Sequence, residues 1–106
     1  VILGMGEDGH TASLFPGSKS LEETDRLAVS VYLDKPNWNR ITLTLPILNN
    51  AAQILFLVTG QAKADVVSEI LRDGEKKRQF PAGLISPIQG NVTWLIDQEA
   101  AGKLKY

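Results

Sequence analysis

A glycine-rich stretch near the start of the chain constrains the fold more than any other feature. The glycines Gly4, Gly6 and Gly9 directly follow the short apolar run 1–3. His10, the single histidine of the chain, comes immediately after them. Glycine lets a backbone turn sharply and adopt positive φ, so the stretch predicts a tight loop at the end of a buried strand. In α/β proteins, such loops hold the ligand-binding and catalytic groups.

The rest of the chain alternates between predicted strands and predicted helices. Apolar or period-two runs predict strands, and apolar residues at helical spacing predict a helix after Gly60. Helices can serve as crossovers between parallel strands, so we predict an α/β fold with a mainly parallel sheet and helices on both faces. The predicted strands are 1–3, 27–33, 40–45, 53–59 and 91–96. The predicted helices are one or two turns within 10–15, a helix start near 20–23, a short helix over 46–50, a helix from Gly60 that Gly74 caps, and a tail helix after Asp97. Residues 34–39 are predicted as a loop and residues 82–88 as irregular.

Composition limits the partners and the chemistry. The 106 residues are 43% hydrophobic and 22% charged, the profile of a globular domain with one core. The net charge is −1, and acidic residues precede the basic run 76–78, so we expect no nucleic-acid partner. With no cysteine and one histidine, Cys-based zinc sites and multi-histidine metal sites are excluded. No apolar run reaches the ~20 residues of a membrane span, so we expect no membrane partner.

The segment 4–9 also matches the G-x-G-x-x-G pattern of dinucleotide-binding loops, and Asp34 lies where a ribose-binding acid belongs. Three features argue against this interpretation. Glu7 and Asp8 would face the pyrophosphate with two negative charges. The pair 16–17, Pro-Gly, stops a helix too early for a full crossover. The histidine would also have no role in such a site, so we set the dinucleotide interpretation aside.

The longer string Gly-Met-Gly-Glu-Asp-Gly-His-Thr-Ala-Ser-Leu-Phe-Pro-Gly, residues 4–17, resembles the signature segment of the 6-phosphogluconolactonase family. Further segments resemble that family in the same order: the strand 40–46, the Gly-x-x-Lys-Ala helix start at 60–64, and the closing segment 92–97. The resemblance covers essentially the whole chain but only the C-terminal half of the family. It implies a Rossmann-like fold and a single domain over 1–106 that lacks its N-terminal half.

The resemblance implies hydrolysis of 6-phospho-D-glucono-1,5-lactone to 6-phospho-D-gluconate, a cytoplasmic step of the pentose phosphate pathway that needs no metal or organic cofactor. Lactone hydrolysis requires an activated water, a stabilised oxyanion and a proton for the ring oxygen. His10 is the expected general base, at a helix N-terminus whose dipole favours the neutral imidazole. Asp8 is expected to orient His10, and Gly9 and the amides after it are expected to contact the substrate or water. A turn-capping histidine and an Asx-turn aspartate are the alternatives.

The phosphate of such a substrate requires cations and amides. Lys63 is predicted in the first turn of the helix after Gly60, where an ammonium and free helix amides together form an anion site. Arg40 opens a strand, so its guanidinium can reach the active edge of the sheet. The resemblance implies that both residues bind the sugar phosphate, and the expected partner is therefore a small phosphosugar lactone. The alternatives are a surface lysine and an edge salt bridge.

Two other functions stay open at this point. Glucosamine-6-phosphate deaminases resemble the chain around the histidine and the Gly-x-x-Lys-Ala helix, but that family has asparagine and glutamate at the positions of Leu14 and Phe15. The carboxylate that assists opening of a sugar ring is therefore missing here. A non-catalytic sugar-phosphate-binding domain would need Lys63 but would have no use for His10.

Overall fold

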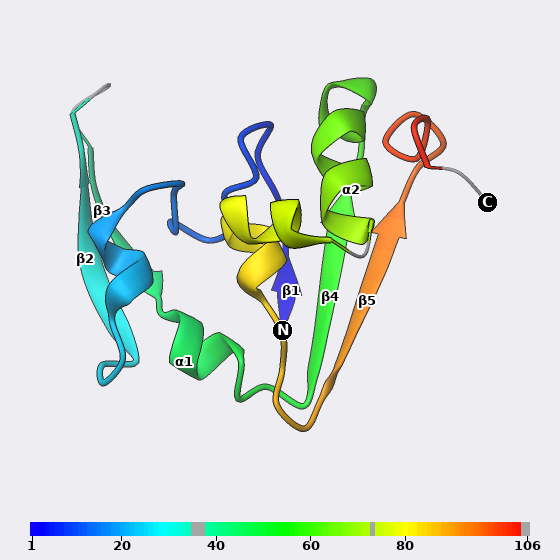
Figure 1. Ribbon diagram of the computed structural model, residues 1–106. Coiled ribbons are helices and arrows are strands. Elements are labelled where there is room, and N and C mark those ends of the chain that lie inside the picture. The colour runs from blue at the N-terminus through cyan, green and yellow to red at the C-terminus, as the bar shows by residue number, and fades with distance from the viewer. Residues whose placement is uncertain (35–37, 73, 105–106) are drawn as a thin grey trace.

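A three-stranded parallel sheet lies beside a separate two-stranded antiparallel pair in the computed structural model, which describes residues 1–34, 38–72 and 74–104 (Figure 1). The strands are β1 (Ile2–Leu3), β2 (Ala28–Leu33), β3 (Trp38–Leu43), β4 (Gln53–Val58) and β5 (Asn91–Ile96). The parallel sheet has the order β1–β4–β5, and its three strands run in one direction. Their carboxyl ends therefore meet at one edge, which is at the top of Figure 1.

Short helices connect these strands. The longest, α2, begins after a 3₁₀ turn and has eight residues. Within the described ranges, no helix is long and apolar enough to cross a membrane. The helices are α1 (Leu45–Leu48) and α2 (Ala64–Leu71), and the 3₁₀ helices are η1 (Lys19–Glu22), η2 (Gln61–Lys63), η3 (Glu75–Gln79) and η4 (Pro81–Leu84).

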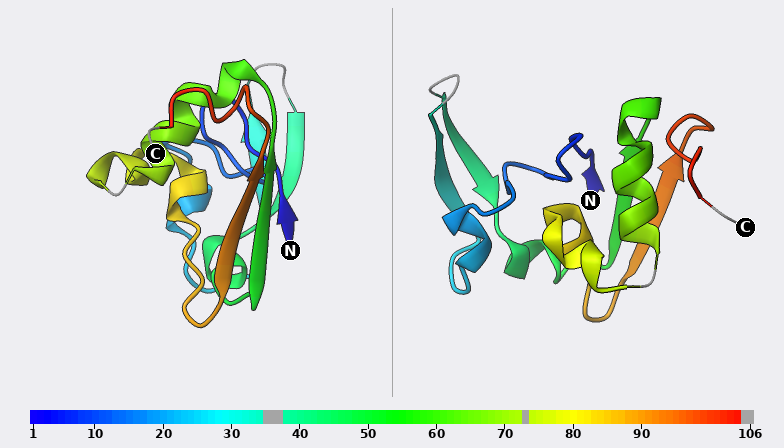
Figure 2. Two further views of the ribbon diagram at one scale, coloured as in Figure 1. Left: turned by 90° about the vertical axis from the view of Figure 1, so that its right-hand side faces the viewer. Right: turned by 45° about the horizontal axis from the view of Figure 1, so that its top comes forward.

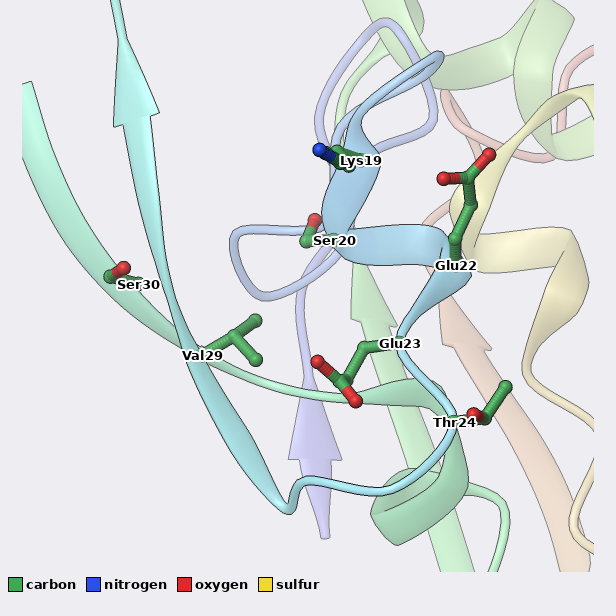
Figure 3. Close-up of a pocket in the computed structure, with 7 residues that line it drawn as sticks. All are labelled: Lys19, Ser20, Glu22, Glu23, Thr24, Val29 and Ser30. Carbon is green, nitrogen blue, oxygen red and sulfur yellow. The ribbon is translucent and has the colours of Figure 1, made fainter.

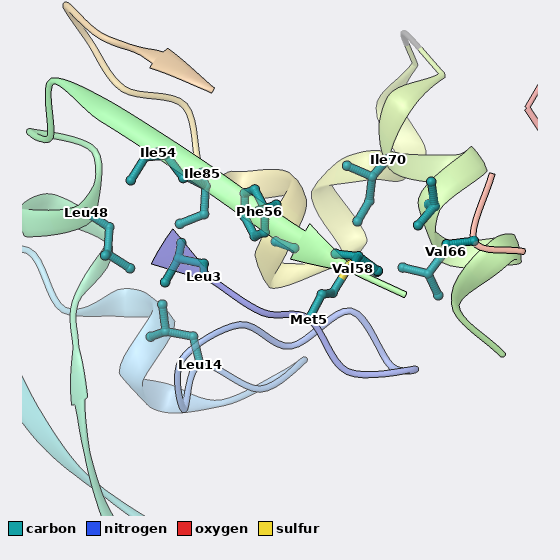
Figure 4. Packing of buried hydrophobic residues seen from close by; sticks show 13 residues of the cluster. Leu3, Met5, Leu14, Leu48, Ile54, Phe56, Val58, Val66, Ile70 and Ile85 are labelled. Atoms are coloured by element: carbon teal, nitrogen blue, oxygen red, sulfur yellow. The ribbon is translucent and has the colours of Figure 1, made fainter. Parts of the chain in front are cut away.

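One face of the parallel sheet carries the hydrophobic core. Strand β4 alternates between its two faces, and Ile54, Phe56 and Val58 are buried. Trp94 of β5 stacks on Phe56 with 4.1 Å between ring centroids. Helices α2 and η4 cover this face (Figure 2, left; Figure 4), and each large apolar side chain buried there contributes roughly 1.5–3 kcal/mol. The buried members are Leu3, Met5, Leu14, Leu48, Ile54, Phe56, Val58, Val66, Val67, Ile70, Ala82, Ile85 and Ala100.

The opposite face of the sheet is exposed and apolar. Ile2, Leu57 and Leu95, one from each strand, are 70%, 50% and 56% exposed. The predicted α/β fold with a parallel sheet is confirmed. In the part of the chain that the structure describes, the helices pack against one face of that sheet, whereas the prediction had helices on both.

Strands β2 and β3 form an antiparallel hairpin, in register from the pair Ala28–Leu43 to the pair Leu33–Trp38. The two segments were predicted as strands, and the structure pairs them with each other, apart from the parallel sheet. Of the loop predicted over 34–39, residues 35–37 lie outside the described residues, and Trp38 already belongs to β3.

The helical turns predicted within 10–15 are wrong. The segment forms a tight turn closed by a bridge between Thr11 and Leu14, and Ala12 takes φ +51°. The Thr11 hydroxyl donates to the Gly4 carbonyl at 2.8 Å, and the Ser13 N–H donates to the Thr42 hydroxyl oxygen at 3.0 Å. These two tertiary hydrogen bonds hold the backbone in a conformation that a helix cannot adopt.

Of the other predicted helices, those near 20–23, over 46–50 and after Gly60 hold in position, whereas the tail helix does not. The helix predicted from Gly60 is present as η2 and α2, and it ends at Leu71, one residue after Ile70, the last buried residue of the helix. Gly74 has an extended φ of −154°, so it is not the C′ cap that the sequence predicts. The expected tail helix after Asp97 is a series of turns.

Candidate active site

Three loops meet at the carboxyl edge of the parallel sheet. The glycine-rich loop 4–17 follows β1, the segment from Gly60 to Lys63 follows β4, and Asp97 follows β5 (Figure 1). This edge is where α/β sheets place their ligands. The strand order therefore brings residues from both ends of the sequence to one place.

Asp8 and His10 form a hydrogen-bonded pair within the first loop. One carboxylate oxygen, Asp8 Oδ1, lies 2.6 Å from His10 Nδ1 and accepts the His10 main-chain N–H at 3.0 Å. The side chains of His10 and Asp8 are 31% and 52% exposed, so the pair is open to solvent. The predicted helix N-terminus beside His10 is wrong, because residues 10–15 form a turn, and no helix dipole acts on the imidazole there.

The pairing fixes which form of each group is present. Partial burial raises the pKa of the Asp8 carboxyl, but hydrogen bonds from the His10 main chain and ring outweigh burial and lower the pKa below its ordinary value. An ionised carboxylate can only accept hydrogen bonds, so Nδ1 of His10 carries the hydrogen. The other nitrogen, Nε2, then has a free lone pair whenever the imidazole is neutral.

Two glycines shape this loop, each for a steric reason. A Cβ at Gly6 would overlap the His10 ring and lie 2.9 Å from Asp8 Oδ1. Gly9 has φ +84°, and a Cβ there would lie 2.6–2.9 Å from the Phe80 side chain. The Gly9 N–H donates to the Gly6 carbonyl and its own carbonyl accepts from Ala82 N–H. Both polar groups of Gly9 are thus engaged inside the protein, and a substrate contact by Gly9 stays a prediction.

Arg40 of β3 approaches the pair through an aromatic residue. The Phe15 ring lies 4.5 Å from the His10 ring, centroid to centroid, at an angle of 32°. Arg40 Cζ lies 6.0 Å from the Phe15 centroid and 4.6 Å from the ring of Trp38. The hydrogen bond from Ser13 to Thr42, two residues along β3, holds the hairpin and the loop together.

Lys63 reaches the same loop from the other side. It is the last residue of η2 and immediately precedes α2, as the predicted helix start required. Its ammonium donates to the main-chain carbonyl of Met5. An ammonium has three hydrogens, so two remain for a ligand. A hollow of about 340 Å³ opens beside this contact, lined by Gly4, Met5, Gly6, His10, Thr11 and Ala12.

Asp97 supports the segment that carries Lys63, and the sequence analysis assigned it no role. Its carboxylate accepts the Ala100 N–H at 2.8 Å and the Gly60 N–H at 3.1 and 3.2 Å. These hydrogen bonds, from Ala100 first and then Gly60, lower the pKa of Asp97. The sequence contained a signal for this role: an aspartate directly follows one predicted strand, and a glycine follows the neighbouring strand.

A second hollow lies away from these residues, between η1 and β2 (Figure 3). Glu22, Glu23 and Lys19 are among the residues that line it. The Glu23 carboxylate already accepts the N–H groups of Asp25 and Arg26. None of the predicted site residues lines this hollow, so the chemistry is assigned to the carboxyl edge of the sheet.

The edge of the sheet thus combines a carboxylate-oriented imidazole with two cations. Asp8 pairs with His10, the Phe15 ring contacts both His10 and Arg40, and Lys63 donates to Met5 of the same loop. Among residues 1–34, 38–72 and 74–104, no group of three or more histidine, aspartate and glutamate residues is placed to hold a metal ion. The arrangement can accept a proton beside a bound anion.

The fold and the site define an α/β protein with a histidine–aspartate pair at the carboxyl edge of a parallel sheet. The sequence profile of the glucosamine-6-phosphate isomerases/6-phosphogluconolactonase family matches residues 1–94. The chain therefore belongs to this family.

Individual relatives agree with that assignment. The rat 6-phosphogluconolactonase is 43% identical over 102 residues, which are 95% of this chain and 39% of the rat protein. The structure of 6-phosphogluconolactonase from Trypanosoma brucei matches with a TM-score of 0.80 and 34% identity over 99% of this chain and 41% of that one. A monomeric glucosamine-6-phosphate deaminase matches with a TM-score of 0.74 and 26% identity, over 95% of this chain and 46% of its own. The chain thus spans about two fifths of the relatives' length.

Proposed function

We propose that this chain is the C-terminal portion of a 6-phosphogluconolactonase, and that residues 1–106 belong to one domain completed by a further N-terminal half. The proposed reaction is hydrolysis of 6-phospho-D-glucono-1,5-lactone to 6-phospho-D-gluconate in the cytoplasm. The single observation that carries this proposal is the Asp8–His10 pair, in which the carboxylate orients an imidazole that lines the hollow of the loop. Relatives at 43% identity bear the name of this activity.

In the proposed mechanism, His10 is the general base. Its Nε2 takes a proton from water as the water oxygen bonds to the lactone carbonyl carbon, and the carbonyl oxygen becomes an oxyanion. The carbonyl then re-forms, the bond to the ring oxygen breaks, and the imidazolium returns the proton to that oxygen. Asp8 holds the ring orientation and stabilises the imidazolium, since its depressed pKa keeps it ionised.

Arg40 and Lys63 are the proposed phosphate-binding residues. A phosphate monoester carries about −1.5 to −2 charge at pH 7, and charge-assisted hydrogen bonds to cations are the strong ones. Arg40 is held by Trp38 and Lys63 by the Met5 carbonyl, so both cations are partly ordered before a ligand arrives. Ordering in advance lowers the entropy cost of binding.

The lactonase assignment is favoured over a deaminase by the side chain beside His10. Phe15 occupies the position at which the deaminase family has glutamate, and its ring lies beside His10. A phenyl ring cannot transfer the proton that ring opening requires. The Asp8–His10 pair likewise favours an enzyme over a non-catalytic binding domain, because a binding domain would have no use for an oriented base.

The test is a lactonase assay with fresh 6-phosphogluconolactone, comparing the 106-residue chain with one extended N-terminally to full length. The lactone hydrolyses spontaneously, so each rate is set against buffer alone. We expect activity in the long form and loss of it in the 106-residue form, because the site is completed by the other half. No activity in either form with phosphosugar binding retained, or release of ammonia from glucosamine 6-phosphate, would overturn the proposal.

A further inference from the structure

The Phe15 ring contacts two site residues, His10 and Arg40, and lies outside the hydrophobic core cluster. The ring lies 4.5 Å from the His10 ring, and Arg40 lies over it at 6.0 Å. The neighbouring residue Leu14 is fully buried in the core cluster, whereas Phe15, among the residues that the structure describes, is neither a member of that cluster nor packed against it. Core packing therefore does not account for the aromatic ring at this position.

The two contacts restrict motions that the other interactions leave free. The hydrogen bond to Asp8 fixes the Nδ1 edge of His10, but the imidazole can still tilt about that bond. A ring 4.5 Å away closes one side of the imidazole and limits the tilt, which sets the direction of Nε2. The second contact is with Arg40: the face of the Phe15 ring attracts the guanidinium, which also stacks on Trp38.

We propose that Phe15 is a positioning residue that sets the direction of the His10 base and the placement of the Arg40 cation relative to each other. The inference rests on the proposed lactonase function. Phe15 touches no reacting atom; it acts through the two residues it contacts. One side chain thereby couples the proton-transfer end of the site to the phosphate end, which neither Asp8 nor Trp38 does alone.

The test uses the full-length protein and three substitutions, Phe15→Leu, Phe15→Met and Phe15→Tyr. Leucine and methionine keep apolar bulk but remove the ring, and tyrosine keeps the ring. Phe15 lines a further hollow, formed with residues 16–20 and 30–33 and distinct from the one in Figure 3, so shorter side chains meet no steric conflict there. Two different ring-less variants are included so that a folding failure of one leaves the other to be measured.

We expect Phe15→Leu and Phe15→Met to lower kcat about tenfold, because a misdirected base loses near-attack geometry. We expect KM to rise about threefold, because one contact of Arg40 with an aromatic face is lost. Phe15→Tyr should restore both parameters to near the wild-type values. In a cycle with Arg40→Met, the KM effects should be less than additive, because the Phe15 contact with Arg40 is already absent in the Arg40→Met background.

The outcomes separate this inference from the proposed function. Lack of lactonase activity in the wild-type full-length protein would refute the proposed function itself. Wild-type activity with unchanged kcat and KM in a folded Leu or Met variant would refute only the role of Phe15. Equal losses in the Tyr variant would also refute it, because the ring would then not be the group that matters.

Discussion

The two ends of the candidate site are built in different ways. The base end pairs Asp8 with His10, two positions apart in one loop, through hydrogen bonds of the His10 ring and main chain with Asp8 Oδ1. The cation end takes Arg40 from a hairpin strand and Lys63 from the start of a helix. The base end is therefore a local structure, whereas the cation end exists only after the hairpin and α2 have packed.

This difference predicts different consequences of mutation. Changes at the base end should alter turnover with little effect on folding, since both side chains are partly exposed. Changes at the cation end should alter substrate affinity. Changes in residues that hold this end in place, such as Asp97, should alter the stability of the folded protein. The five substitutions below test this division, beginning with the largest expected effect.

Replacing His10 by alanine should reduce kcat about 10²- to 10⁴-fold, the usual contribution of a general base. Thermal unfolding of the full-length variant should be nearly unchanged, because the ring lies outside the core cluster. The measurement is steady-state lactone hydrolysis corrected for the spontaneous rate. Near-normal turnover would remove His10 from the mechanism.

Gly6→Ala tests the base end without changing a titratable group. The added Cβ overlaps the His10 ring and approaches Asp8 Oδ1 to 2.9 Å, so the pair has to move apart. We expect kcat to fall about 10- to 100-fold, because small displacements of a catalytic group are costly. Gly4→Ala is the matched control, since a Cβ at Gly4 meets nothing within 4 Å. Equal activity in the two variants would contradict the steric role of Gly6.

Arg40→Met and Lys63→Met test the cation end. Each removes one charge-assisted hydrogen bond to phosphate, so KM should rise about tenfold while kcat changes less. Arg78→Met and Lys76→Met are the controls, because both residues are exposed on η3 and neither lines the hollow beside His10. If the η3 substitutions raise KM as much as the site substitutions do, the effect is one of net charge.

Asp97→Asn gives the smallest expected effect, on stability rather than turnover. The Asp97 pKa is lowered from 3.8 in the folded protein, so its carboxylate stabilises the fold above that pH and loses this contribution as pH falls through the lowered value. The thermal unfolding midpoint should fall by a few degrees at pH 7, and the difference from wild type should shrink below pH 3.8. Exposed Asp25→Asn is the control; a difference that persists unchanged at low pH would contradict the assignment.

Local chemistry explains which parts of the fold and site the sequence could predict. The strands at 53–59 and 91–96 were predicted because their residues are apolar or β-branched over a full strand length, and they form β4 and β5. The proximity of Asp8 and His10 followed from their spacing of two residues in a glycine-rich turn. Both predictions needed only neighbouring residues.

The parts that the sequence could not predict depend on distant contacts. The turn at 10–15 replaces a helix because Thr11 bonds to Gly4 and Ser13 bonds to Thr42. The contact of Lys63 with Met5 spans 58 residues. Periodicity in one segment carries no information on such partners, so these features emerge only from the packed structure.

The apolar stripe on the open face of the sheet bears on the behaviour of the 106-residue polypeptide in solution. Ile2, Leu57 and Leu95 point into water from three adjacent strands. Two such faces can stack about 10 Å apart, as the sheets of a β-sandwich do. Self-association of the isolated chain should therefore increase with concentration and with sulfate, which strengthens apolar burial, and charged substitutions on this face should suppress it.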